Sequence, residues 1–238
     1  ETDGLSCTTD TCVGISGPKC RFDAVAGYCA IDNACLLDGS RHPTWSCLAC
    51  DNATSGHGWT DQCGAQPRLV ITEFMANPNT VADSVGEWIE LFNPTAAPIE
   101  LQGMTLKDLD VDSHVIAKSV VVAPGAYVGV GRSDDRSVNG NVGIVYTLDH
   151  YALGNFGDEI LLLDRQGNEL DRVVFDSSWI VPGSSCALRS PTSDNSQLAN
   201  WCVSSKLWVS GVNRSPGQAN QCPTPVSDLN HPPRRPQQ

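Results

Sequence analysis

The stretch EILLLDRQGNELDRVVF, residues 159–175, decides the fold class of this chain. It holds two runs rich in aliphatic and β-branched residues, joined through Arg165, Gln166, Gly167 and Asn168. Glycine and asparagine tolerate the positive φ angles of a tight connection between antiparallel strands. The stretch therefore predicts a β-hairpin.

Similar apolar runs lie on both sides of this hairpin, bounded by residues typical of turns. They span residues 69–75, 87–92, 104–107, 114–117, 119–122, 126–131, 143–148 and 186–189. We expect a second hairpin in VVVAPGAYVGVG, residues 120–131, around Pro124 and Gly125. No segment of useful length has the period of a helix. Ten short strands in about 120 residues are typical of a sandwich, so we predict a mainly β fold.

The 11 cysteines of the chain are unevenly distributed. Eight lie in the first 63 residues, at Cys7, Cys12, Cys20, Cys29, Cys35, Cys47, Cys50 and Cys63. That region has almost no periodic apolar pattern, so we predict that four disulfides hold it, in pairings that the sequence does not specify. We divide the chain into a cysteine-rich module at 1–66, a β-sandwich at 67–222 and a Pro-rich tail at 223–238.

Cysteine content and charge bound the location and the partners. Eleven cysteines without a haem-attachment motif indicate an oxidising compartment, so we predict a secreted or cell-surface protein. No leader pattern opens the sequence, and we expect its numbering to begin at a mature end. No run of about eighteen apolar residues is present to span a bilayer. The net charge of -12 argues against nucleic acid as a partner.

Two motifs in the module suggest sharper chemistry. CLAC, residues 47–50, has the spacing of a zinc knuckle or a redox dithiol. It lacks the second close Cys or His pair of a zinc site and the strand-to-helix turn of a thioredoxin-like motif. DGLSCTTDTC, residues 3–12, offers Asp3 and Asp10 as oxygen ligands for calcium. For this stretch we favour a tight disulfide turn.

KDLDVDSH, residues 107–114, has the carboxylate spacing that opens a calcium loop. The candidate ligands are Asp108, Asp110 and Asp112. A calcium loop also requires a distal bidentate carboxylate, and Lys118 or Ser119 stands where that acid belongs. We therefore expect a solvated turn followed by a strand that begins at His114, with calcium as the alternative. We expect no other cofactor.

The sequence shows no arrangement for catalysis, so we predict that the chain is not an enzyme. Glu73, Glu87 and Glu90 lie in apolar strands, where a buried carboxylate needs a partner such as Lys107, Arg132 or backbone amides. Carboxylates that point into a sandwich core offer no cleft for a substrate. The serines of PGSSC lack a nucleophile elbow, and the five histidines are scattered.

Seven motifs, taken in order, resemble the lamin tail domain family. They are VITEFMANP, GEWIELFNP, GMTLKDLDVDSH, AYVGVGRSDDRSVNGNVG, ALGNFGDEILLLDRQGNELDRVVF, ANWC and SPGQAN. The resemblance covers about residues 68–222, is to the version found in secreted bacterial proteins, and implies an immunoglobulin-like β-sandwich. Residues 1–66 resemble the small cysteine-rich modules that precede such domains in bacterial surface proteins.

The resemblance also implies a pairing among the three remaining cysteines. Cysteines after the NW pair and past PGxxN suggest a bond between Cys202 and Cys222. Cys186 is then left to meet the module, another subunit or nothing. A bond between Cys186 and Cys202 is the competing pairing.

These observations together predict a non-enzymatic, extracellular structural or interaction protein. Its expected role is that of a subunit of a cell-surface or extracellular assembly, with protein subunits, including copies of itself, as partners. The alternative is an accessory module that binds carbohydrate or protein through exposed tryptophans. The candidate tryptophans are Trp45, Trp59, Trp88, Trp179, Trp201 and Trp208. Of these, Trp88 and Trp201 lie in the motifs of the family resemblance, and we expect them to pack the core instead.

The tail CPTPVSDLNHPPRRPQQ, residues 222–238, has too few apolar residues to fold alone. A polyproline-like backbone suits docking in a groove, and a basic pair suits an acidic surface. We expect the tail to reach a neighbouring subunit. The residues expected to make this contact are Pro225, Leu229, Pro232, Pro233, Arg234 and Arg235.

Overall fold

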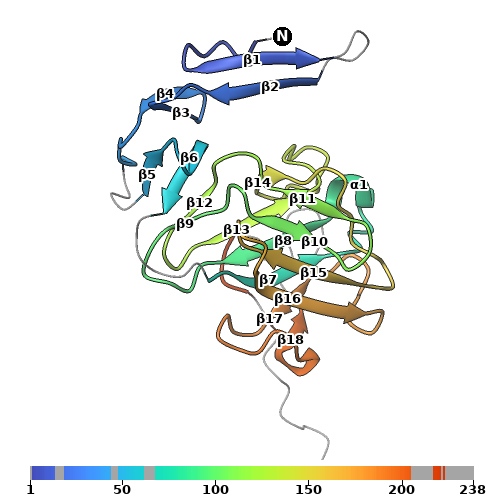
Figure 1. Cartoon of the computed structure of the whole chain (residues 1–238). Helices are drawn as coiled ribbons and strands as arrows, with labels where there is room; N and C mark the ends of the chain where they lie inside the picture. Colours follow the sequence, from blue (N-terminus) through green and yellow to red (C-terminus); the bar gives the residue numbers. More distant parts are fainter. Residues whose placement is uncertain are drawn as a thin grey trace, which may run out of the picture.

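The computed structural model describes residues 2–13, 19–43, 48–61, 68–204, 217–220 and 222. Strands dominate, with one helical turn, α1 (Asp83–Gly86), and one 3-10 turn, η1 (Leu198–Asn200). Figure 1 shows a small set of hairpins, coloured blue to cyan, beside a larger body of strands coloured green to orange. We call the described residues up to 61 the module and residues 68–204 the sandwich.

Three hairpins form the module. They pair β1 (Thr8–Val13) with β2 (Lys19–Ala24), β3 (Tyr28–Ile31) with β4 (Ala34–Leu37), and β5 (Leu48–Asp51) with β6 (Ser55–Asp61). The apolar core is only Cys29, Ile31, Leu48, Cys50 and Trp59. Because so small a core buries little apolar surface, covalent links must supply much of the stability.

Disulfides join the hairpins of the module. The bonds are Cys7–Cys35, Cys12–Cys20 and Cys29–Cys50. Cys12 and Cys20 are opposite each other in the first hairpin, whereas the other two bonds link different parts of the module. Three bonds are therefore present in the described part of the module. Cys47 and Cys63 lie outside the described residues.

Two main sheets and a short two-stranded ladder form the sandwich. The larger sheet has the order β14-β13-β8-β7-β17-β18, with β14 (Ile144–Thr147), β13 (Tyr127–Gly131), β8 (Trp88–Phe92), β7 (Val70–Met75), β17 (Cys186–Leu188) and β18 (Trp201–Val203). The other has the order β11-β10-β15-β16, with β11 (Ser113–Val115), β10 (Thr105–Lys107), β15 (Gly157–Leu163) and β16 (Glu169–Asp176). β12 (Val121–Val122) pairs with β9 (Ile99–Glu100).

The core lies between the two sheets, where alternate residues of each strand meet. Ile89 and Leu91 project from β8, while Ile160 and Leu162 project from β15, and all four are fully buried. The rings of Phe74 and Phe175 pack with their centroids 4.4 Å apart. The mainly β, immunoglobulin-like sandwich predicted from the sequence is confirmed, and each of the ten predicted strands is present.

The two predicted hairpins had different outcomes. β15 and β16 pair as expected, and Gly167 in their turn has a φ of 84°. The hairpin predicted at 120–131 is wrong. A tight turn does form there, with Gly125 at a φ of 68°, but the strands on its two sides join different partners. β12 pairs with β9, which brings Ile99 into the core, and β13 pairs with β8.

Residues 217–220 and 222 lie against the larger sheet. The Asn220 Nδ2 donates to the carbonyl of Thr72 on β7 at 2.6 Å and to that of Leu188 on β17 at 2.9 Å. The disulfide Cys202–Cys222 then ties this segment to β18. The tail predicted at 223–238 lies outside the described residues.

Candidate functional site

Two of the three aspartates in residues 107–114, Asp108 and Asp112, accept hydrogen bonds from backbone amides. The Asp108 Oδ1 accepts hydrogen bonds from the amides of Asp110 and Asp112, both at 2.9 Å. The Asp112 Oδ2 accepts from the Ala152 amide at 2.9 Å. The expected turn is present, although Asp108 is buried rather than solvated. Within the described ranges, no group of three or more His, Cys, Asp or Glu side chains is arranged to hold a metal ion.

The strand expected to begin at His114 begins one residue earlier, and the histidine joins it to a neighbouring loop. Its ring lies in the sandwich, with the Nε2 3.0 Å from the Tyr146 hydroxyl and the Nδ1 3.0 Å from the Asp149 carbonyl. The Tyr146 hydroxyl also accepts from the Ala117 amide at 2.9 Å. The histidine therefore has a structural role that its sequence context did not indicate.

The cysteine motifs of the module are divided among different bonds. Cys50 of CLAC bonds to Cys29, so this motif is not a free dithiol. Cys7 and Cys12 bond to residues outside 3–12, and the tight disulfide turn expected within that stretch is wrong. Asp3 instead closes the local turn, because its Oδ1 accepts from the Leu5 amide and the Thr8 hydroxyl at 2.9 and 2.8 Å.

Glu73 and Glu90 form a buried pair on the larger sheet. They lie opposite each other on β7 and β8, and both are 0% exposed. The Thr72 hydroxyl donates to Glu90 Oε1 at 2.8 Å, and the Gly217 amide donates to Glu90 Oε2 at 2.6 Å. Burial, and then the nearby Glu73, raise the pKa of Glu90 to about 9. Glu90 is therefore protonated at neutral pH.

Glu87 is a third buried acid, between α1 and β8. Its Oε2 accepts from the Leu153 amide at 3.1 Å, so a backbone amide is the partner, as one of the sequence alternatives proposed. Burial raises the pKa of Glu87 to about 7, against the lowering effect of that amide. The nearby Arg132 donates to the Tyr151 carbonyl. These groups face the interior and connect loops, which is a structural arrangement.

Cys186 is a free thiol in the described structure, while Cys202 bonds to Cys222. This is the pairing that the family resemblance implies. The Cys186 Sγ is 2.7 Å from the Trp179 carbonyl, and the residue is 5% exposed. Burial, followed by the charge of Glu73, raises the pKa of Cys186 to about 12. The thiol is therefore protonated and shielded.

The tryptophans of the described residues do not form an exposed binding platform. Trp59, Trp88, Trp179 and Trp201 are each less than 10% exposed. Trp59 belongs to the module core, and Trp179 and Trp201 pack in the sandwich core. Trp45 and Trp208 lie outside the described residues. The stacking role is wrong for Trp59 and Trp179, which belong to the cores of the module and the sandwich. Trp88 and Trp201 are buried, as their place in the family motifs indicated.

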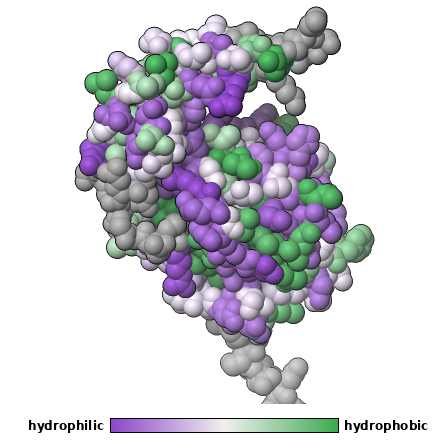
Figure 2. Space-filling model, viewed as in Figure 1, coloured by the Kyte–Doolittle hydropathy of each residue, from purple (hydrophilic) through white to green (hydrophobic). Residues whose placement is uncertain are grey.

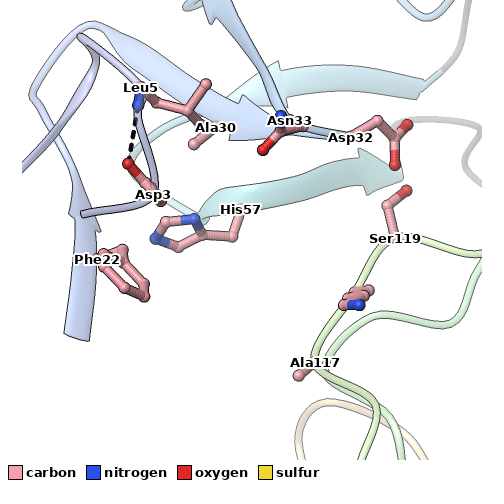
Figure 3. A pocket seen from close by; sticks show the side chains of 10 residues that line it. Asp3, Leu5, Phe22, Ala30, Asp32, Asn33, His57, Ala117 and Ser119 are labelled. Carbon is pink, nitrogen blue, oxygen red and sulfur yellow. Dashed lines mark hydrogen bonds between the residues drawn. The ribbon is translucent and has the colours of Figure 1, made fainter. Parts of the chain in front are cut away.

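A pocket of about 480 Å³ lies where the module meets the sandwich (Figure 3). We call it the junction pocket. Module residues Asp3, Leu5, Phe22, Ala30, Asp32, Asn33 and His57 line it, together with sandwich residues Ala117, Lys118 and Ser119. Sequence reasoning missed this site, because its two walls are distant in sequence.

The module wall depends on a two-residue turn between β3 and β4. Asp32 and Asn33 occupy this turn with φ angles of 51° and 60°. Asp and Asn adopt such angles more readily than other side chains, and these are the residues that favour two-residue hairpin turns. Both side chains are exposed toward the pocket. The DN pair between the runs YCAI and ACLL was the signal available in the sequence.

Gln102 holds the two walls together. Its Nε2 donates to the carbonyl of His57 in the module and, at 3.0 Å, to that of Ala117 in the sandwich. The Ser55 hydroxyl donates to its Oε1 at 3.2 Å. Arg165 adds a second link, since its Nη2 lies 3.4 Å from the Trp59 carbonyl. Because Gln102 is only 8% exposed, water competes little for these bonds.

A second surface feature lies on two adjacent loops of the sandwich. Leu109 and Val111 are 55% and 90% exposed, and Phe156 on the neighbouring loop is 87% exposed. The bond from the Ala152 amide to the Asp112 carboxylate holds the two loops together. We call Leu109, Val111 and Phe156 the loop surface. Figure 2 shows hydrophobic residues set among hydrophilic ones on the face in view.

Acidic residues flank the three residues of the loop surface in the sequence. They are Asp108, Asp110, Asp112, Asp158 and Glu159. The pKa of Asp158 is raised, first by burial and then, against two amide hydrogen bonds, by the carboxylates of Asp108 and Glu159. The loops thus place apolar side chains within a negative field.

A comparison with known protein families finds one family model that matches part of the chain. Residues 63–177 match the family model of the Lamin Tail Domain. Lamin tail domains form a non-catalytic, immunoglobulin-like family. The match to the lamin tail domain ends just after β16, yet β17 continues the sheet beside β7 and β18 follows beside β17. No curated protein matches this chain.

None of the helices in the described part of the chain is long and apolar enough to cross a membrane.

Proposed function

We propose that this protein is a non-enzymatic, extracellular interaction protein that serves as a subunit of a cell-surface assembly. The loop surface is the observation that carries the proposal. Large apolar side chains gathered on adjacent loops mark a contact site, because water solvates them poorly and a partner can cover them. The disulfides of the module support an oxidising, extracellular location.

The partner that best fits the loop surface is the tail of a second copy of this chain. The tail combines apolar Val226 and Leu229 with the basic pair Arg234 and Arg235. The loop surface combines apolar side chains with carboxylates. Apolar groups on both sides exclude water, and opposite charges set the orientation of the contact. A proline-rich backbone also loses less conformational entropy when it docks.

Particle mass measured by light scattering tests this proposal. The intact chain is expected to form particles of more than one copy. Both the deletion of residues 224–238 and the double substitution Val111→Ser, Phe156→Ser are expected to give single chains. A chain that carries both changes should have the same particle mass as a chain with either change alone, because each change removes one side of the same contact. The matched control is Val13→Ser, at a module residue that is 67% exposed and outside the loop surface.

Three outcomes would remove the proposal. The first is an intact chain that stays a single copy at every concentration measured. The second is a truncated chain that assembles like the intact chain. The third is a loop double variant that assembles normally, which would place the contact elsewhere.

A further inference from the structure

The junction pocket has the properties of a small-molecule site that is separate from the loop surface. Its volume of about 480 Å³ lies within the usual range for ligand pockets, roughly 300–1,000 Å³. Its lining combines charged, amide, hydroxyl and aromatic side chains from both parts of the chain. The walls are held at a defined separation by Gln102, so the pocket is formed before a ligand arrives.

The polar groups of the lining complement a ligand that is rich in hydroxyl groups. The carboxylate of Asp32 accepts hydrogen bonds, the ammonium of Lys118 donates them, and the amide of Asn33 does both. The Ser119 hydroxyl donates to Glu100 at 2.6 Å, which leaves its oxygen free to accept from a ligand. Sugar hydroxyl groups donate and accept, so they can satisfy all of these side chains at once.

The aromatic part of the lining supplies a face for the apolar side of a sugar ring. Figure 3 shows the His57 ring between Asp3 and Phe22, on the module side of the pocket. Phe22 is half-buried, so part of its ring remains accessible. In the same view the Ser119 hydroxyl points toward the Asp32 carboxylate across the pocket. A bound ring can therefore contact both walls.

The charges of the lining select among saccharides. Asp3 and Asp32 are two carboxylates, and Lys118 is the one ammonium group among the lining residues. This excess of negative charge disfavours uronic acids and phosphorylated sugars, and favours a neutral sugar or one that carries an amino group. An apolar ligand would leave the polar lining without hydrogen-bond partners, which is costly.

We propose that the junction pocket binds a short saccharide, neutral or amino-bearing, with Asp32, Asn33, Lys118 and Ser119 contacting its hydroxyl groups. Phe22 packs against its C–H face. The site needs both the module and the sandwich, so neither part binds the sugar alone.

The test is an NMR titration of the full chain with glucosamine, glucose and glucuronic acid, which share one ring and differ in charge. Shifts are expected in the amide signals of Asn33, His57 and Lys118. Glucosamine is expected to bind about tenfold more tightly than glucuronic acid, which corresponds to about 1.4 kcal/mol. Glucose should lie between them.

Matched substitutions locate the binding. Asp32→Asn keeps a side chain suited to the positive φ of the exposed turn, removes the carboxylate, and is expected to weaken glucosamine binding about tenfold, which is the scale of one hydrogen bond to a charged group. Phe22→Leu should lower the binding affinity for all three sugars. The control Asp134→Ala removes an exposed carboxylate that is not among the lining residues, and this variant should bind like the native chain. The proposal is overturned if the native chain binds none of the three sugars, or if Asp32→Asn binds glucosamine unchanged.

Discussion

The side chain of Gln102 occupies the space that Gly58 leaves open. A Cβ atom placed on Gly58 would lie 1.5 Å from the Gln102 Oε1, far closer than two atoms can approach. Gly58 lies on β6 of the module, and Gln102 follows β9 of the sandwich. The packing of Gln102 against Gly58 joins the module to the sandwich, and it allows the Gln102 amide to reach the His57 carbonyl.

We predict that Gly58→Ala separates the module from the sandwich without unfolding either. The added methyl group displaces Gln102, and overpacking of this kind typically costs about 1–3 kcal/mol. Hydrogen exchange should increase along β6 and at Ala117. The matched control is Gly143→Ala, where the nearest atoms belong to the end of the flexible Arg136 side chain. If hydrogen exchange along β6 and at Ala117 is unchanged in Gly58→Ala, the packing of Gln102 against Gly58 does not hold the module and the sandwich together.

Reduction is expected to unfold the module while the sandwich remains folded. The module has three described disulfides, and two residues of its small core are themselves bonded cysteines. The sandwich has a continuous apolar core between its sheets. Amide exchange under mild reductant distinguishes the two parts. Equal loss of protection in both would contradict this prediction.

The stability of the sandwich is expected to fall as the pH rises. Burial raises the pKa of Glu90 to about 9, above its ordinary value of 4.5 in the unfolded chain. The stabilisation from protonated Glu90 is therefore complete below about pH 4.5 and is lost as the pH rises to about 9. Glu90→Gln should be more stable than the native chain at alkaline pH, since a neutral amide can accept from Gly217 and donate to Thr72.

Denaturant unfolding at several pH values measures this effect. The slope of unfolding free energy against pH should be smaller in Glu90→Gln than in the native chain. Part of the slope should remain, because Glu87 also has a raised pKa, about 7. The control is Glu169→Gln, at an exposed glutamate paired with Arg172. If Glu90→Gln and the native chain show the same slope, Glu90 does not titrate as described.

The thiol of Cys186 is expected to resist alkylation in the native protein. It is 5% exposed, and its pKa is raised to about 12, so almost no thiolate is present near pH 8. Peptide mapping after iodoacetamide treatment should show it unmodified until denaturant is added. Val111→Cys, at a position that is 90% exposed, provides a reactive control in the same chain. Rapid native labelling of Cys186 would rule out the buried position.

Removal of divalent ions is expected to change the melting temperature little. The Asp108 carboxylate already accepts from two backbone amides, which hold the loop without a metal ion. Differential scanning calorimetry with and without EGTA measures the effect. A shift above about 10 °C would show that a bound cation contributes to folding.

The sequence by itself determined the strands of the sandwich. Alternating apolar residues and turn-forming glycines report local geometry, so the hairpin at 159–175 and all ten predicted strands could be read directly. β9 and β18 were missed because two or three residues carry too little pattern. The presence of disulfides in the module also followed from composition, since a short segment with few apolar residues has little else to stabilise it.

The tertiary structure decided which strands and side chains meet. The turn at Pro124 and Gly125 formed as the local sequence indicated, but partners available elsewhere in the fold determined where its two strands paired. Cysteine pairing and the junction pocket depend in the same way on segments that are distant in sequence. Gln102 shows the reason most clearly: a polar residue in a turn carries no local signal, and only packing against Gly58 gives its amide two carbonyls to bind.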